Sequence, residues 1–157
     1  MSSDYFKVLK HLKIETDIVG RGKESAFNFE KENNTTVISR DLNDYINSTR
    51  INSIDSAIIS VNIENLYDVC NKLLDTDIKH ILLEKPGFLY ENEIYNLEKK
   101  SKSLNKKIFI AYNRRFYNSV IKLNNIIKDD GGVKSCNFDF TEWSHVIEDL
   151  KMKKNVK

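Results

Sequence analysis

Short apolar runs alternate with amphipathic segments along the chain. Residues 56–61 and 80–84 are continuous apolar runs, which is typical of strands buried on both faces of a parallel sheet. Between these runs, apolar residues recur at i, i+3, i+4, i+7 and i+8, the spacing of an amphipathic helix: Leu66, Val69, Cys70, Leu73 and Leu74. The pattern therefore predicts parallel strands joined by helices.

The same alternation continues on both sides of this segment. It predicts further strands at 18–19, 36–39 and 107–112, and helices at 4–12, 23–33, 41–46, 94–104 and from Asn118 onward, with Ser2, Ser3 and Asp4 as a cap for the first helix. Because crossovers between parallel strands are right-handed, these elements give an α/β fold with a doubly wound parallel sheet. Ligands of such sheets bind at the carboxyl ends of the strands.

The pattern changes after Gly131 and Gly132. Cys136, Phe138 and Phe140 alternate with polar residues, which predicts a strand at 134–143 with one buried face, as in an antiparallel sheet. We therefore expect one domain over residues 1–130 and the beginning of a second, α+β domain over 131–157.

Composition narrows the class of protein. The chain has 157 residues, a formal net charge of +2 and a hydrophobic share of 40%, which fits a globular domain with a real core. Its apolar runs are far shorter than the ~20 residues of a membrane span, and no secretory signal opens it. The balanced charge disfavours a nucleic-acid partner. Cys70 and Cys136 are expected to be reduced, buried thiols in the cytoplasm, and no metal site is expected.

Two polar strings follow predicted strands at the ligand edge. In the first, Lys85 could donate or relay a proton if partial burial lowers its pKa, with Pro86 fixing the backbone, in cis or in trans. The alternative for this string is a surface turn with a solvated ion pair. In the second, the paired bases Arg114 and Arg115 suit an anionic or polyhydroxyl ligand, and the alternative is a loop paired with nearby carboxylates.

A third string, Gly20 to Lys23, follows the predicted strand at 18–19. Dinucleotide folds carry an acidic residue at this place to bind the ribose hydroxyls, or a basic residue for a 2′-phosphate. Here Arg21 and Lys23 flank Gly22, which favours NADP over NAD; the alternative is a glycine-rich turn with exposed bases.

Taken together, Val-Gly-Arg-Gly (19–22), Ile-Ile-Ser-Val-Asn (58–62), Leu-Leu-Glu-Lys-Pro-Gly (82–87) and Ala-Tyr-Asn-Arg-Arg-Phe (111–116) resemble the Gfo/Idh/MocA oxidoreductases in order and spacing. The resemblance implies a Rossmann-type domain that binds NAD(P). It also implies hydride transfer on a hydroxyl of a sugar, polyol or sugar nucleotide. The Tyr-Asn-Arg-Arg-Phe string resembles members that act in the synthesis of surface polysaccharides. The family resemblance also implies a homo-oligomer when full length. By this resemblance Lys85 is the catalytic residue and also lines the cofactor, together with Arg21, Gly22, Lys23, Ser60, Val61, Asn62, Glu84, Asn113 and Arg114.

The chain departs from the family pattern at both ends. The first strand and the Gly-x-Gly-x-x-Gly loop of the family have no counterpart, and the substrate domain stops after its expected first strand. We therefore expect a fragment that is inactive by itself, binds cofactor weakly or not at all, and leaves strand edges uncovered. The alternative is a non-catalytic Rossmann-like pseudo-enzyme or interaction module.

Overall fold

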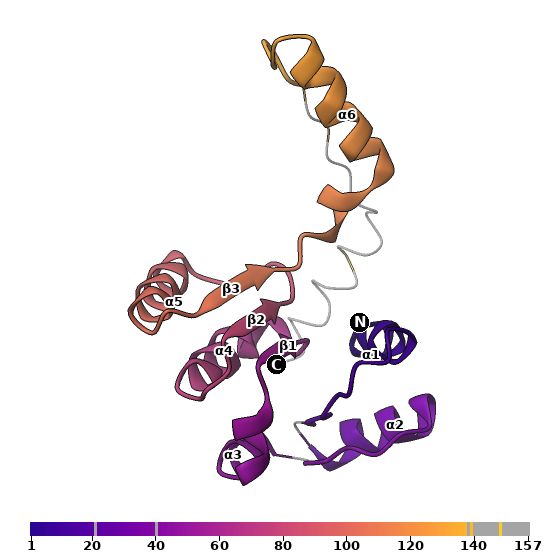
Figure 1. Cartoon of the computed structure of the whole chain (residues 1–157), viewed down its shortest axis with the longest axis vertical. Helices are drawn as coiled ribbons and strands as arrows, with labels where there is room; N and C mark the ends of the chain where they lie inside the picture. Colours follow the sequence, from indigo (N-terminus) through magenta and orange to yellow (C-terminus); the bar gives the residue numbers. More distant parts are fainter. Residues whose placement is uncertain (21, 40, 138, 140–147, 149–157) are drawn as a thin grey trace. The chain divides into compact units, whose positions relative to one another are not determined.

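The computed structural model describes residues 1–20, 22–39, 41–137, 139 and 148 (Figure 1). The chain divides into two units, Met1–Asn113 and Arg114–Lys157. The domain boundary near residue 131 stays a prediction from the sequence.

Helices and parallel strands alternate in the first unit, as the sequence predicts. The elements in chain order are α1 (Ser2–His11), α2 (Lys23–Asn33), α3 (Leu42–Ile46), the 3-10 turn η1 (Thr49–Ser53), β1 (Ser56–Ile59), η2 (Ile63–Asn65), α4 (Leu66–Leu74), β2 (His80–Leu83), α5 (Glu91–Ser103) and β3 (Lys107–Ile110). The turn η3 (Asn113–Phe116) begins at the last residue of this unit, and α6 (Asn118–Asp129) lies in the second unit.

The three strands form a parallel sheet in the order β1-β2-β3. In the register, Ile59 lies opposite Leu83, and Leu83 opposite Ile110, so these side chains share one face of the sheet. Helices α4 and α5 lie side by side and contact the strands (Figure 1). The core between helices and sheet is made by the fully buried side chains Leu66, Leu74, Ile78, Ile81, Leu83, Leu97 and Cys70.

The opposite face of the sheet is more open in the described part of the chain. Its central row is Ile58, Leu82 and Phe109, which lie opposite one another in the register. Ile58 is 37% exposed and Phe109 is 52% exposed, whereas Ile81 and Leu83 on the other face are fully buried. The face with Ile81 and Leu83 therefore contributes more of the hydrophobic stabilisation of the fold than the face with Ile58 and Phe109.

The predicted strands at 18–19 and 36–39 are wrong as extended strands. The structure has a single parallel bridge between Val19 and Ser39, with the Gly20 amide donating to the Ser39 carbonyl at 2.8 Å. The apolar run at 18–19 is too short to build a ladder, since Gly20 follows it at once. Among the described residues, β1 pairs only with β2, so its other edge carries no strand, as expected from the sequence. The predicted strand at 134–143 falls largely outside the described residues.

A partly buried acidic side chain links the segment before this bridge to α3 and η1. The Asp17 carboxylate accepts hydrogen bonds from Arg50 Nε at 2.9 Å, from Arg50 Nη2 at 2.7 Å and from the Tyr45 hydroxyl at 2.7 Å. These bonds, led by the Arg50 guanidinium, lower the pKa of Asp17 although burial acts against them. Val19, two residues further on, packs against the main core.

Helix α1 begins earlier than the sequence predicts. Met1 is its N-cap and no side chain caps it, so the expected cap by Ser2, Ser3 and Asp4 is wrong. The helix contacts α2 through an edge-to-face pair of Phe6 and Phe29, whose ring centroids are 5.8 Å apart.

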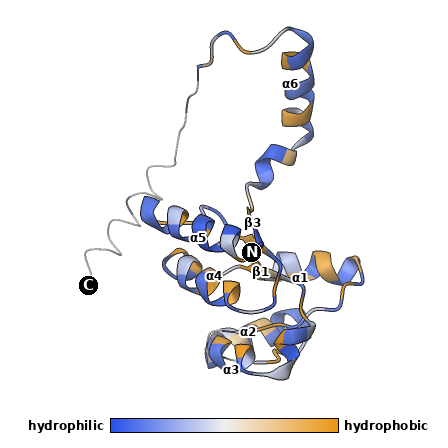
Figure 2. Cartoon of the chain, turned by 60° about the vertical axis from the view of Figure 1, so that its left-hand side comes forward, coloured by the Kyte–Doolittle hydropathy of each residue, from blue (hydrophilic) through white to orange (hydrophobic). Residues whose placement is uncertain are grey.

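Hydrophobic and hydrophilic residues alternate along helix α6 (Figure 2). None of its residues is buried. In the described part of the chain, no helix is both long and apolar enough to cross a membrane.

Adjacent residues of β2 test the difference between the two sheet faces. Leu83→Ala should lower the free energy of unfolding by about 2–5 kcal/mol, because it opens a cavity under α4 and α5. Leu82→Ala makes the same chemical change on the more open face and should cost about 1 kcal/mol. Urea unfolding followed by circular dichroism measures both. Equal costs would mean that both faces are equally covered.

Candidate functional site

Three loops leave the sheet at one edge. Because the strands are parallel and in register, Ser60, Glu84 and Ala111 each follow the last residue of a strand at the same level. The ladder continues one step into these loops, since the Glu84 amide donates to the Ile59 carbonyl at 3.0 Å and the Ala111 amide to the Leu83 carbonyl at 2.9 Å. The predicted residues that follow β1, β2 and β3 in the first unit are therefore brought to one edge of the sheet.

Glu84 is the best-held polar residue of this edge. Its side chain is buried, with 7% of the residue exposed. One carboxylate oxygen, Oε1, accepts a hydrogen bond from the Tyr5 hydroxyl at 2.7 Å, and the other, Oε2, accepts from the backbone amide of Lys85 at 2.9 Å. A buried carboxylate is stable only when hydrogen bonds replace its water, and these two bonds do so.

Lys85 lies on the outer side of the same loop. The Lys85–Pro86 peptide bond is cis, one of the two geometries expected from the sequence. The Tyr112 hydroxyl donates to the Pro86 carbonyl at 3.1 Å and so joins this loop to the one after β3. The Lys85 side chain is exposed, which corrects the partial burial expected from the sequence. The ammonium group is free to reach a ligand, while the backbone beneath it is held.

Gly87 lets the loop turn in a conformation that strains other residues. Its φ is +90°, in the region that favours glycine. A Cβ atom at this position would lie 2.9 Å from Cδ1 of Ile110 on β3. The loop after β2 therefore passes directly against the neighbouring strand.

The other predicted residues have less defined surroundings. Ser60 and Val61 are partly buried after β1, while Asn62 and Asn113 are exposed. Arg114 is exposed and belongs to the second unit, and its place beside the edge stays a prediction.

The glycine-rich string is described only in part. Gly22 and Lys23 stand at the start of α2, with Lys23 exposed, and Arg21 lies outside the described residues. The preference for NADP stays a prediction.

The two cysteines differ from each other. Cys70 is fully buried in the core, as predicted, and burial raises its pKa to about 12. Cys136 is exposed, so the prediction of a second buried thiol is wrong. Within the described ranges, no group of His, Cys, Asp and Glu side chains could hold a metal ion.

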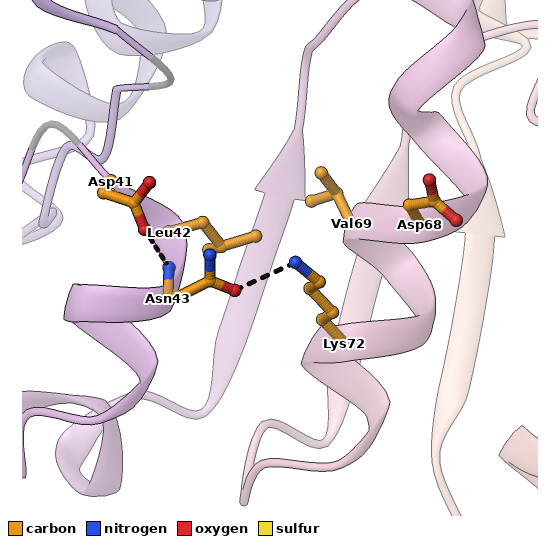
Figure 3. Close-up of a pocket in the computed structure, with 6 residues that line it drawn as sticks. All are labelled: Asp41, Leu42, Asn43, Asp68, Val69 and Lys72. Atoms are coloured by element: carbon orange, nitrogen blue, oxygen red, sulfur yellow. Dashed lines mark hydrogen bonds between the residues drawn. The ribbon is translucent and has the colours of Figure 1, made fainter.

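A small polar cavity of about 190 Å³ lies between α3 and α4 (Figure 3). Lys72 donates to the Asn43 side chain across it at 2.9 Å, and Asp41 accepts from the Asn43 amide at 2.7 Å as the predicted cap of α3. Its lining consists of Asp41, Leu42, Asn43, Asp68, Val69 and Lys72, none of which is a predicted site residue. Asp41, Asn43 and Lys72 are joined by these hydrogen bonds, and no residue of the cavity lies at the carboxyl edge of the sheet.

Sequence reasoning did not single out two residues that hold the edge. Tyr5 lies 79 positions from Glu84, and nothing local in the sequence relates the two. Tyr112 was part of the string after β3, where its aromatic ring was noted as a neighbour of the arginines but its hydroxyl was given no role. The only available signal for Tyr5 was a polar aromatic residue on the first helix.

Solved structures that this chain resembles include NAD-binding dehydrogenases and oxidoreductases of the Gfo/Idh/MocA type. The WlbA dehydrogenase from Chromobacterium violaceum, solved in complex with NADH and UDP-GlcNAcA, is 15% identical, with a TM-score of 0.70 over 82% of this chain and 37% of its own. An NAD-binding oxidoreductase from Klebsiella pneumoniae is 14% identical, with a TM-score of 0.59 over 71% of this chain and 28% of its own. The chain thus spans little more than a third, or less, of the length of these proteins.

No family model matches the sequence, and no curated protein matches it. At such low identity the likeness shows the fold, an α/β Rossmann-type arrangement with a parallel sheet among helices. The Rossmann-type fold class predicted from the sequence is confirmed.

The close approach at Gly87 yields a test of the loop. Gly87→Ala should lower the free energy of unfolding by about 2 kcal/mol or more, because the Cβ atom meets Ile110 and the positive φ is strained. Ile110→Val removes the Cδ1 atom that lies nearest. The double variant should therefore cost less than the sum of the single variants in urea unfolding. Strict additivity would show that the loop does not press against β3.

Proposed function

We propose that this chain is the nucleotide-binding part of an NAD(P)-dependent oxidoreductase of the Gfo/Idh/MocA type. The proposed reaction is hydride transfer on a hydroxyl of a sugar, a polyol or a sugar nucleotide. One observation carries the proposal: the exposed Lys85 stands on a backbone held by Glu84 and Tyr112, at the carboxyl edge of a parallel sheet.

The comparisons support the proposal in two ways. Their fold binds a dinucleotide in the Chromobacterium violaceum and Klebsiella pneumoniae proteins, and the former also holds a sugar nucleotide. The share of those chains that is covered supports a domain of a longer enzyme. The substrate of that enzyme would be recognised largely by residues outside this chain.

The described edge fits the nicotinamide end of such a cofactor. Exposed polar side chains, Asn62, Lys85 and Asn113, follow the three strands, and the buried Glu84 carboxylate accepts a hydrogen bond from the Lys85 amide. The pyrophosphate end has less to bind it, since no Gly-x-Gly-x-x-Gly turn occurs in the 157 residues. A bound nicotinamide supplies the chemistry of accepting or donating hydride.

We assign the proton of the reaction to Lys85 on the condition that bound cofactor and substrate enclose its exposed side chain and so favour the neutral amine. Under that condition the amine takes the hydroxyl proton when a hydroxyl is oxidised, and in the reverse direction the ammonium group returns a proton to the carbonyl oxygen. The buried carboxylate of Glu84 fixes the amide of Lys85 and so limits where the side chain starts. We assign Asn62 and Asn113 to binding and orientation, because amides donate and accept hydrogen bonds without exchanging protons at neutral pH.

The second candidate is a non-catalytic Rossmann-like module. The lack of a glycine-rich phosphate turn within the sequence favours it, because such a module has no need to hold a pyrophosphate. A binding experiment separates it from the enzyme domain.

NADH titrated into the ¹⁵N-labelled chain tests cofactor binding at the edge. We expect a weak complex, with Kd of about 1 mM or weaker, because few groups hold the pyrophosphate. Amide shifts should move at Ser60, Glu84 and Lys85, and stay fixed at Asp55 and Lys79 on the opposite, amino edge of the sheet. Saturation with no change at the carboxyl edge would favour the non-catalytic module.

Turnover of the longer oxidoreductase tests the role of Lys85. With NAD⁺ or NADP⁺ and UDP-GlcNAcA as the probe, Lys85→Ala should lower kcat by about 10²-fold or more and change the KM for the cofactor far less. The matched control is Lys79→Ala, which removes an exposed lysine at the other end of the same strand. A kcat unchanged by Lys85→Ala would remove this residue from the mechanism.

A further inference from the structure

Helix α1 reaches the candidate site through one side chain. The Tyr5 hydroxyl donates to Oε1 of Glu84 at 2.7 Å, across 79 positions of sequence. Tyr5 is partly buried, and its ring lies on the first turns of α1. This contact joins a neutral phenol donor to a carboxylate acceptor, which makes it a charge-assisted hydrogen bond.

The Glu84 carboxylate links Tyr5 to the backbone of Lys85. Its second oxygen, Oε2, accepts from the Lys85 amide at 2.9 Å, while the Glu84 amide donates to the carbonyl of Ile59 on β1. A carboxylate with both oxygens engaged has one orientation, whereas a carboxylate with one bond can rotate about χ3. Without Tyr5, the Lys85 amide would face an acceptor that is no longer fixed.

The environment of Tyr5 agrees with this geometry. Burial first, and then the hydrogen bond to Glu84 and its negative charge, raise the pKa of Tyr5 to about 12. The phenol therefore stays a donor throughout the physiological range.

We propose that Tyr5 is a positioning residue of the site: through the carboxylate of Glu84, its hydroxyl fixes the backbone from which Lys85 extends. This role rests on the proposed function, because it assigns Tyr5 to the geometry of proton transfer at the carboxyl edge. It gives α1 a part in the site. A change in the position of α1 would reach Lys85 through two hydrogen bonds.

The first arm of the test needs no cofactor. In Tyr5→Phe, which keeps the ring and removes the hydroxyl, hydrogen exchange of the Lys85 amide should become about tenfold faster, a factor that corresponds to about 1.4 kcal/mol. The matched control is Tyr95→Phe, which removes a hydroxyl bonded to Glu91 at 3.1 Å on the exposed side of α5. Should Tyr5→Phe fail to fold, Glu84→Gln tests the link from the other side, because it leaves one acceptor oxygen for the two donors, Tyr5 and the Lys85 amide, and removes the negative charge. In Glu84→Gln, ¹³C-tyrosine NMR should show that the pKa of Tyr5 has fallen from about 12.

The second arm uses NADH as the probe. At one NADH concentration below saturation, wild type and Tyr95→Phe should give equal shift changes at Lys85, and Tyr5→Phe a shift change about tenfold smaller. Unchanged amide exchange in Tyr5→Phe, or faster exchange with an unchanged NADH-dependent shift, would overturn the role of Tyr5 alone. Wild-type chain that shows no NADH-dependent shift at the carboxyl edge would favour the non-catalytic module over the proposed function, while the exchange data still decide the role of Tyr5.

Discussion

The buried carboxylate of Glu84 is the contact on which the candidate site depends. It stands where β2 ends, and its two oxygens join α1 to the backbone of Lys85 while its amide joins β2 to β1. Burying a carboxylate is unfavourable unless its hydrogen bonds are restored, so its position requires both partners at once. The side chain of Lys85 is exposed, while its backbone amide is held by the Glu84 carboxylate.

The sheet supports this contact by how its faces are covered. Helices α4 and α5 bury one face, where Ile81 and Leu83 are fully enclosed, and this layer fixes the level at which β2 ends. Gly87 then lets the loop pass against Ile110, and the Tyr112 hydroxyl holds the Pro86 carbonyl from the next strand. Hydrophobic packing therefore fixes where β2 ends, and hydrogen bonds fix the path of the backbone in the loop that follows it.

Most of the fold could be predicted from the sequence because its signals are local. The apolar spacing from Leu66 to Leu74 predicts a helix, and the apolar runs at 56–61 and 80–84 predict strands. The structure has α4, β1 and β2 at these places. The strands at 18–19 and 36–39 failed because pairing depends on a neighbour, and the bridge at Val19 and Ser39 has no wider sheet around it among the described residues. A short apolar run does not indicate whether a neighbouring strand is present to pair with it.

The sequence could name candidate residues for the site but not the contacts between them. The string at 84–86 lies in the loop after β2, and its role in a site stays a prediction. The exposure of Lys85 and the link from Tyr5 to Glu84 depend on tertiary structure. The central claim is that a nicotinamide cofactor binds above this loop. Its most direct test is the set of intermolecular NOEs between the nicotinamide ring protons of NADH and the chain. The account predicts NOEs to the side chain of Lys85. NOEs to Asp41 and Lys72 in the cavity between α3 and α4, with none at Lys85, would contradict it.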